Sequence, residues 1–170
     1  EGRPTVGGFG VFHVPGHCPG QVCLLVDDVL LTADQVLARI TPHQAPESIT
    51  MNMGLGHYLD SLDKVAGLPG VRLGLGGHED PIDDVPGRVA AIRAAHDERL
   101  GKIMDICRAP QSIAGISRAL FGHVDSYHVL LALEETGAHV EYLHQRGELM
   151  AANLEEIEAT SRPVVEYVRG

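Results

Sequence analysis

The chain has 170 residues, of which 44% are hydrophobic and 21% charged, and its formal net charge is −10 at pH 7. This composition is typical of a globular protein with ample material for a core. The negative charge argues against nucleic acid as a partner, because phosphate binding needs clustered lysine and arginine. No apolar run is long enough to cross a bilayer and no basic-then-apolar signal opens the chain, so we expect no membrane partner.

Residues 1–84 are rich in glycine and proline and contain several short apolar runs. Four of these runs are predicted strands: 9–14, 21–26, 29–32 and 71–75. Asp27-Asp28 is a plausible tight turn between the second and third strands. Residues 56–66 place their apolar side chains on one face of a helix before the fourth strand. Strands separated by a helix predict a layered α/β half-domain over residues 1–84.

From Pro86 onward the apolar residues recur at helical spacing, and Pro110 is expected to end this first helix. Ser112 can cap a second helix that ends at Gly122. A third helix, capped by Asp125 or Ser126, is expected to close at Gly147. Residues 85–152 are therefore predicted to form a mainly helical domain that ends in a short strand over 148–152.

Residues 153–170 are predicted to form a polar, loosely held tail, of which Val164, Val165 and Val168 can dock. In the segment 109–150 two basic residues face five acidic ones, a difference of 2 − 5 = −3. This sign is wrong for binding a phosphate backbone, so a nucleic-acid-binding regulator is the weakest interpretation.

The cysteines and histidines bear on location and chemistry. Cys18, Cys23 and Cys107 are scattered without CxxC spacing, which indicates a reducing cytoplasm and no disulfide framework. The ten histidines favour a metal site, with a histidine-rich surface as the alternative.

Three short segments share one design, in which an apolar strand runs into a tight turn that presents a metal-type ligand. They are 13–20, 30–34 and 73–82. Strand ends hold side chains stiffly, and glycines let the backbone approach an ion closely. Imidazole suits zinc and iron, and a carboxylate can bridge two cations. Taken singly, each histidine can be an ordinary surface residue, and Asp34 can be a helix cap.

The stretch HVPGHCPGQVCLLVDDVLLTADQVL resembles the metallo-β-lactamase-superfamily sequence that reads H-x-P-G-H-T-P-G, then a hairpin, then T-G-D. LGLGGHEDPIDD resembles the G-H-G-x-P-I loop of the same family. The resemblance implies that His17 is a ligand of a first metal, His78 a ligand of a second, and Asp34 the bridging, catalytic carboxylate. It also implies that His13 supports the turn and is not a ligand.

The resemblance covers roughly residues 5–150, and PGRVAAIRAAHDERLGKIMDIC begins a stretch that is similar to the winged-helix-like extension of one branch. The implied fold is half of an αββα sandwich over 1–84, followed by the mainly helical, winged-helix-like domain over 85–152. The family's H-x-H-x-D-H motif, which belongs to the N-terminal half of the fold, has no counterpart here. Smaller departures are Cys18 for threonine, Gln21 after the P-G, and Ala33 for glycine.

The resemblance implies a hydrolase that uses a two-metal-activated water on an ester, thioester or phosphodiester of a small-molecule substrate. Zinc is the first choice of metal, with iron or manganese as alternatives. Only two ligands per ion remain, where catalytic zinc normally has three, so we expect weak or absent occupancy and no activity if this is the whole protein. The loop 41–48 with His43 can line the substrate mouth, although a solvated loop is the simpler interpretation.

A different class of function is a non-catalytic binding or oligomerisation module derived from the same fold. A half-sandwich exposes one apolar sheet face and open strand edges. Such a chain needs its missing N-terminal half, or a second copy in a homo-oligomer, to cover them.

Overall fold

The structure is a computed structural model that describes residues 5–170. The chain divides into two compact units, Glu1–His96 and Asp97–Gly170, and the division falls inside helix α2 (Val85–Ile106). Among the described residues, no helix is long and apolar enough to span a membrane.

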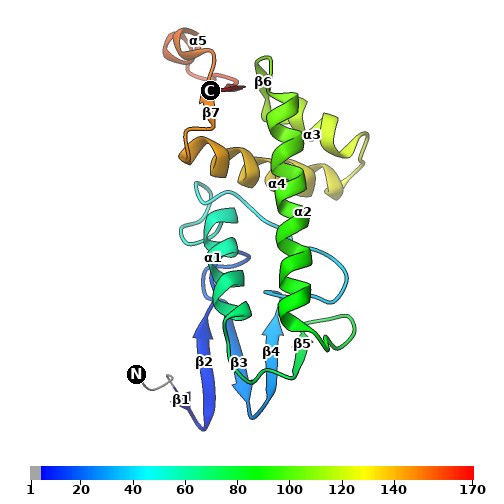
Figure 1. The fold of residues 1–170 in the computed structure, drawn as a ribbon. Coiled ribbons are helices and arrows are strands. Elements are labelled where there is room, and N and C mark those ends of the chain that lie inside the picture. Colours follow the sequence, from blue (N-terminus) through cyan, green and yellow to red (C-terminus); the bar gives the residue numbers. More distant parts are fainter. Residues whose placement is uncertain (1–4) are drawn as a thin grey trace. The chain divides into compact units, whose positions relative to one another are not determined.

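The first unit is built on a five-stranded sheet in the order β1-β2-β3-β4-β5 (Figure 1). The strands are β1 (Thr5–Val6), β2 (Phe9–His13), β3 (Val22–Val26), β4 (Val29–Ala33) and β5 (Leu73–Gly76). β1 to β4 pair antiparallel, and β5 pairs parallel to β4. The four predicted strands are confirmed within two residues at each end. The turn at Asp27-Asp28 is confirmed as well, because Val26 pairs with Val29.

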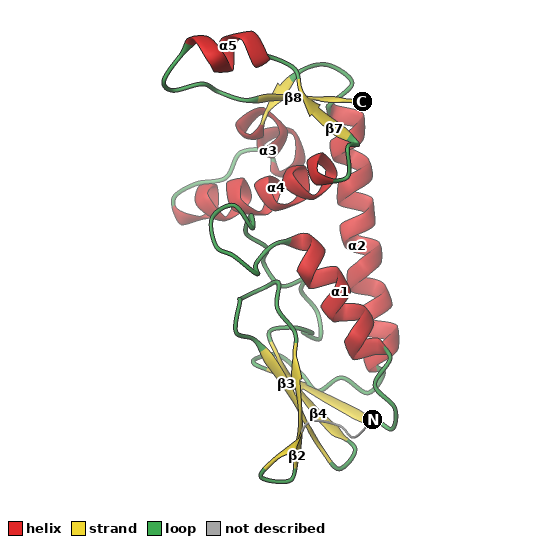
Figure 2. Cartoon of the chain, turned by 90° about the vertical axis from the view of Figure 1, so that its left-hand side faces the viewer, coloured by secondary structure: helices red, strands yellow, loops and turns green. Residues whose placement is uncertain are grey.

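Helix α1 (Leu55–Ala66) and the first half of α2 lie on the same side of this sheet, as Figure 2 shows from the side. The predicted helix over 56–66 is thereby confirmed. Its apolar face is buried, with Tyr58 and Leu62 fully so. Sheet residues that alternate along the strands, such as Cys23 and Leu30, are buried too. This period-two alternation makes one face of the sheet the core of the unit.

The opposite, outward face of the sheet carries the other half of the alternation. Phe9, Val22 and Leu31 are exposed large apolar residues on it. Val11, Leu24, Leu31 and Leu75 are register partners across four neighbouring strands. The outward face therefore presents a continuous apolar row.

The second unit contains the rest of α2 and six further elements. These are β6 (Gln111–Ser112), α3 (Ile113–Phe121), α4 (Tyr127–Gln145), β7 (Leu149–Ala151), α5 (Leu154–Ala159) and β8 (Glu166–Arg169). The predicted cap is confirmed, since the Ser112 hydroxyl accepts a hydrogen bond from the Gly115 N–H at 3.1 Å. Ile103, Ile116, Val140 and Leu143 lie in the buried core of this unit.

The C-terminal segment corrects one expectation. Residues 153–170 do not form a loosely held tail, because β8 is the central strand of a three-stranded antiparallel sheet in the order β6-β8-β7. Val168 pairs with Met150, and the Arg169 N–H donates to the Cys107 carbonyl at 2.8 Å. β8 is short and has few apolar residues, but its backbone pairs with both β6 and β7.

Candidate metal centre

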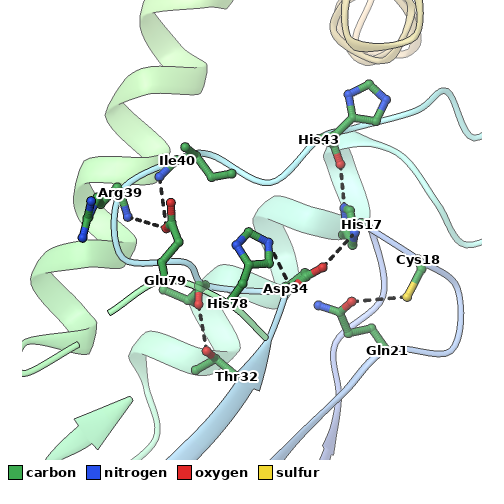
Figure 3. Close-up of polar contacts among 11 residues, drawn as sticks. His17, Cys18, Gln21, Thr32, Asp34, Arg39, Ile40, His43, His78 and Glu79 are labelled. Carbon is green, nitrogen blue, oxygen red and sulfur yellow. Dashed lines mark hydrogen bonds and ion pairs between the residues drawn. The ribbon is translucent and has the colours of Figure 1, made fainter. Parts of the chain in front are cut away.

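The three residues predicted to bind metal lie together in the first unit. His17 comes from the turn between β2 and β3, Asp34 directly follows β4, and His78 follows β5. His17 Nε2 is 3.8 Å from Asp34 Oδ2, and His78 Nε2 is 3.7 Å from Asp34 Oδ1 (Figure 3). Each histidine thus faces a different oxygen of one carboxylate.

The backbone before Asp34 holds an unusual conformation that aims its side chain. Ala33 has φ 46°, in the left-handed region that favours glycine. Its carbonyl accepts a hydrogen bond from the Gly77 N–H at 2.9 Å, which ties the end of β4 to the loop that carries His78. The Thr32 hydroxyl donates to the Val36 carbonyl at 2.8 Å and closes the turn on the other side.

Two glycines make room for the site. A Cβ on Gly77 would overlap the Asp34 carboxylate, so only glycine lets the His78 loop approach so closely. A Cβ on Gly16 would overlap the backbone of Tyr58, and Gly16 has φ 133°. The P-G-H turn can therefore pack against α1 only with glycine at this position.

His17 is oriented by a backbone carbonyl. Its Nδ1 lies 2.7 Å from the carbonyl oxygen of His43. A carbonyl can only accept, so Nδ1 carries the proton and Nε2 keeps the lone pair that a metal needs. His43 thus supports the site through its main chain. Sequence reasoning did not find this role, because every residue has a backbone carbonyl and the side chain at position 43 does not reveal it.

Glu79 joins the two ligand-bearing loops and was also missed. Its carboxylate accepts hydrogen bonds from the backbone N–H groups of Arg39 at 2.8 Å and Ile40 at 3.4 Å (Figure 3). Glu79 has φ 74°, a strained value for a residue with a side chain. The Arg39 guanidinium also forms an ion pair with Asp80, which makes a second link between the same two loops.

Arg88, on α2, binds the backbone of the loop that follows Asp34. Its Nε donates to the Leu37 carbonyl at 2.6 Å and its Nη2 to the Ile40 carbonyl at 2.7 Å. The segment 37–40 is thus held at its carbonyls by Arg88 and at its N–H groups by Glu79. We call Glu79 and Arg88 together the loop clamp.

The remaining residues of the resemblance stretch have structural contacts. His13 Nε2 donates to the Pro19 carbonyl at 2.8 Å, which braces the turn around His17. Cys18 Sγ donates to Gln21 Oε1 at 3.2 Å. Cys18 and Gln21, the two departures from the family pattern in this turn, therefore contact each other. The Gln21 amide in this contact is not a base that could activate the thiol.

The donor atoms are of the types that bind a divalent cation, but there are fewer of them than such an ion usually has. The two histidine–carboxylate separations exceed hydrogen-bond length. Two ligand atoms that share one zinc at bond lengths of about 2.0–2.2 Å lie roughly 3.4–3.8 Å apart for coordination angles of about 110–130°. Nitrogen and carboxylate oxygen are suitable zinc ligands, but His17, Asp34 and His78 would give each of two ions only two ligands, fewer than the usual three.

Neither a protein-family model nor a curated protein matches the sequence. Among solved structures, a beta-lactamase domain protein from Burkholderia ambifaria is 30% identical, with a TM-score of 0.83 over 99% of this chain and 50% of that one. A metallo-beta-lactamase family protein from Thermus thermophilus is 28% identical, with a TM-score of 0.75 over 95% of this chain and 49% of that one.

The chain thus spans about half the length of both solved relatives. Within that half the agreement covers nearly all of this chain. The chain belongs to the metallo-β-lactamase superfamily.

Proposed function

We propose that this chain supplies part of the metal centre of a hydrolase that cleaves an ester, thioester or phosphodiester. The proposal rests on one observation, the Asp34 carboxylate that offers separate oxygens to His17 and His78. His17 and Asp34 would hold a first ion, and Asp34 and His78 a second.

Two bound divalent cations, zinc in the first place and iron or manganese as alternatives, would lower the pKa of a bound water and polarise the scissile oxygen. Asp34 would help to hold both ions and to orient the water. The His43 carbonyl keeps His17 Nε2 free to bind. The loop clamp would keep the loops that carry Asp34 and His78 close together.

Beyond these three residues, each ion would need further ligands. We propose that they come from the N-terminal half of the fold, on the same polypeptide or on a partner subunit. The chain alone is then expected to bind metal weakly and to be inactive. Intact mass compared with 18.2 kDa tells whether the purified protein is longer than this sequence.

Metal analysis of the full-length protein tests the proposal. We expect near-stoichiometric zinc, iron or manganese that is lost in His17→Ala and in His78→Ala. His128→Ala, at an exposed histidine of α4, serves as the matched control and should keep its metal. Full metal content in both site variants would contradict the proposal.

A second candidate is a non-catalytic binding or oligomerisation module. The apolar row on the outward sheet face favours it, with Leu31 exposed at its centre. Metal-free protein that is oligomeric in light scattering, and monomeric after Leu31→Ser, would support this candidate. Residues 85–152 are proposed to be the winged-helix-like extension in either case.

A further inference from the structure

The segment that follows the candidate bridging residue forms the rim of the site. We define the rim loop as residues 39–54. It is tied to the site at three points: Glu79 binds the N–H groups of Arg39 and Ile40, the His43 carbonyl binds His17, and the Gly54 N–H donates to the Gly16 carbonyl at 3.1 Å. These contacts hold the loop beside the centre at both of its ends and at His43.

The rim loop exposes large apolar side chains. Ile40 is 51% exposed, Ile49 64% and Met51 76%. Met51 lies two residues before Met53, whose backbone is bridged to Gly16 beside His17. Ile40 adjoins the Glu79 contact in Figure 3, on the His78 side of the site. Single exposed apolar residues are ordinary, and what distinguishes these three is that they lie on one loop that is anchored at the centre.

The charges around the rim have the opposite sign from those of a phosphate-binding surface. Residues 39–54 and 77–84 contain five carboxylates and one arginine. That arginine, Arg39, is paired with Asp80, and nearby Arg88 is engaged by two backbone carbonyls. Bound cations would offset the charge at the centre itself. A nucleic acid would still extend past the centre over the carboxylates, which repel it.

We infer that the substrate presents an apolar acyl group to the rim loop, and that the bond cleaved is a carboxylic ester or thioester. The inference rests on the proposed function and narrows it. The reaction is hydrolysis: the oxygen of water bonds to the acyl carbon, the C–O or C–S bond breaks, and the leaving alcohol or thiol takes up a proton. No oxidant or further reactant is needed.

Binding of straight-chain carboxylates, the products of such a reaction, provides the test. Acetate, hexanoate and decanoate are titrated calorimetrically into the full-length protein, with zinc and without it, below the micelle concentration of decanoate. A fully buried methylene gives about fourfold in affinity, and a partly exposed one about twofold. Decanoate should therefore bind at least tenfold more tightly than hexanoate.

Ile40→Ser and Met51→Ser should flatten this chain-length dependence while they leave the zinc content unchanged. Leu154→Ser, at an exposed leucine of the second unit, is the matched control and should bind all three carboxylates like the wild type. Ile40→Ser keeps the N–H that Glu79 binds, so the loop anchor is preserved.

The outcomes separate this inference from the proposed function. Stoichiometric zinc without any dependence on chain length overturns the inference and leaves the hydrolase proposal standing. Absent zinc with a chain-length dependence that Met51→Ser removes supports the apolar rim and contradicts the metal centre. Faster hydrolysis of bis(p-nitrophenyl) phosphate than of p-nitrophenyl decanoate also overturns the inference.

Discussion

Ala33 occupies a position where the backbone favours glycine. A left-handed conformation destabilises an alanine by roughly 1–2 kcal/mol relative to glycine. Glycine makes the unfolded chain more flexible, which offsets about 0.4–1 kcal/mol of the gain expected from replacing Ala33. Ala33→Gly is therefore expected to raise the free energy of unfolding by about 0.5 kcal/mol in urea titrations. Ala90→Gly, at an exposed site within α2, should lower it by about 1 kcal/mol. Loss of stability in both variants would contradict the strain at Ala33.

His139 gives the second unit a defined response to acid. Burial, with a smaller contribution from Arg99, lowers the pKa of His139 from 6.5 to about 3, although the hydrogen bond to the Glu135 carbonyl opposes the shift. The unfolded chain binds a proton here below pH 6.5, whereas the folded chain does so only near pH 3. Stability should therefore fall as the pH drops through this window, by at most about 1.4 kcal/mol per pH unit from this group.

His139→Gln removes this titration. Its unfolding midpoint in urea should decline less steeply than that of the wild type between pH 7 and pH 4. His128→Gln changes an exposed histidine on the same helix and should keep the wild-type slope. Parallel curves for wild type and His139→Gln would show that acid sensitivity comes from other groups.

At the scale of elements, the loop clamp is the device that holds two ligand loops together. Supporting residues of this kind typically contribute 10- to 100-fold to metal affinity. Glu79→Ala should weaken zinc binding by about this factor in competition with a chromophoric chelator, and Glu79→Gln should weaken it less because the amide oxygen still accepts. Arg39→Ala removes the ion pair with Asp80 but leaves the backbone donor, so its zinc affinity should stay near that of the wild type.

Equal losses in Glu79→Ala and Arg39→Ala would mean that the exposed ion pair, and not the carboxylate–backbone contact, holds the loops. A lower thermal midpoint with unchanged zinc affinity in Glu79→Ala would assign Glu79 a role in stability alone.

The elements that the sequence predicts correctly are those with long patterns. α1, α2 and α4 repeat an apolar face over several turns, and β2 to β4 are bounded by turn residues. β1 and β6 have two residues each, too few for any period. β8 was missed because its stability comes from its two neighbours in the sheet and not from its own side chains.

The candidate site divides in a similar way. His17, Asp34 and His78 were predicted because their side chains belong to motifs that resemble a known family. The His43 carbonyl leaves no side-chain signature, and Arg88 lies far along the chain from the carbonyls it binds. Glu79 was within a quoted motif, but nothing in its neighbours reveals that it binds the backbone of residues 39 and 40.

At the scale of the whole molecule, the cysteines report on both units. Cys23 is buried in the first unit and Cys107 in the second, and burial raises the pKa of Cys23 to about 12 and that of Cys107 above its ordinary value. Cys18 is only half-buried. Because the thiolate is the reactive form, one thiol should react rapidly with Ellman's reagent in native protein and all three in urea. Rapid reaction of three thiols without urea would contradict the packing of both cores.

The order of strands in the first sheet also bears on how the molecule folds. β1 to β5 lie side by side in the same order as they occur along the chain. Each new strand can therefore add to the growing edge without threading past an earlier one, and most pairings close short loops. The exception is the pairing of β4 with β5, which must wait for residues 34–72. This pairing, which closes the longest loop of the sheet, also brings His78 to Asp34, so metal uptake during refolding is expected to follow the formation of the β4–β5 pair.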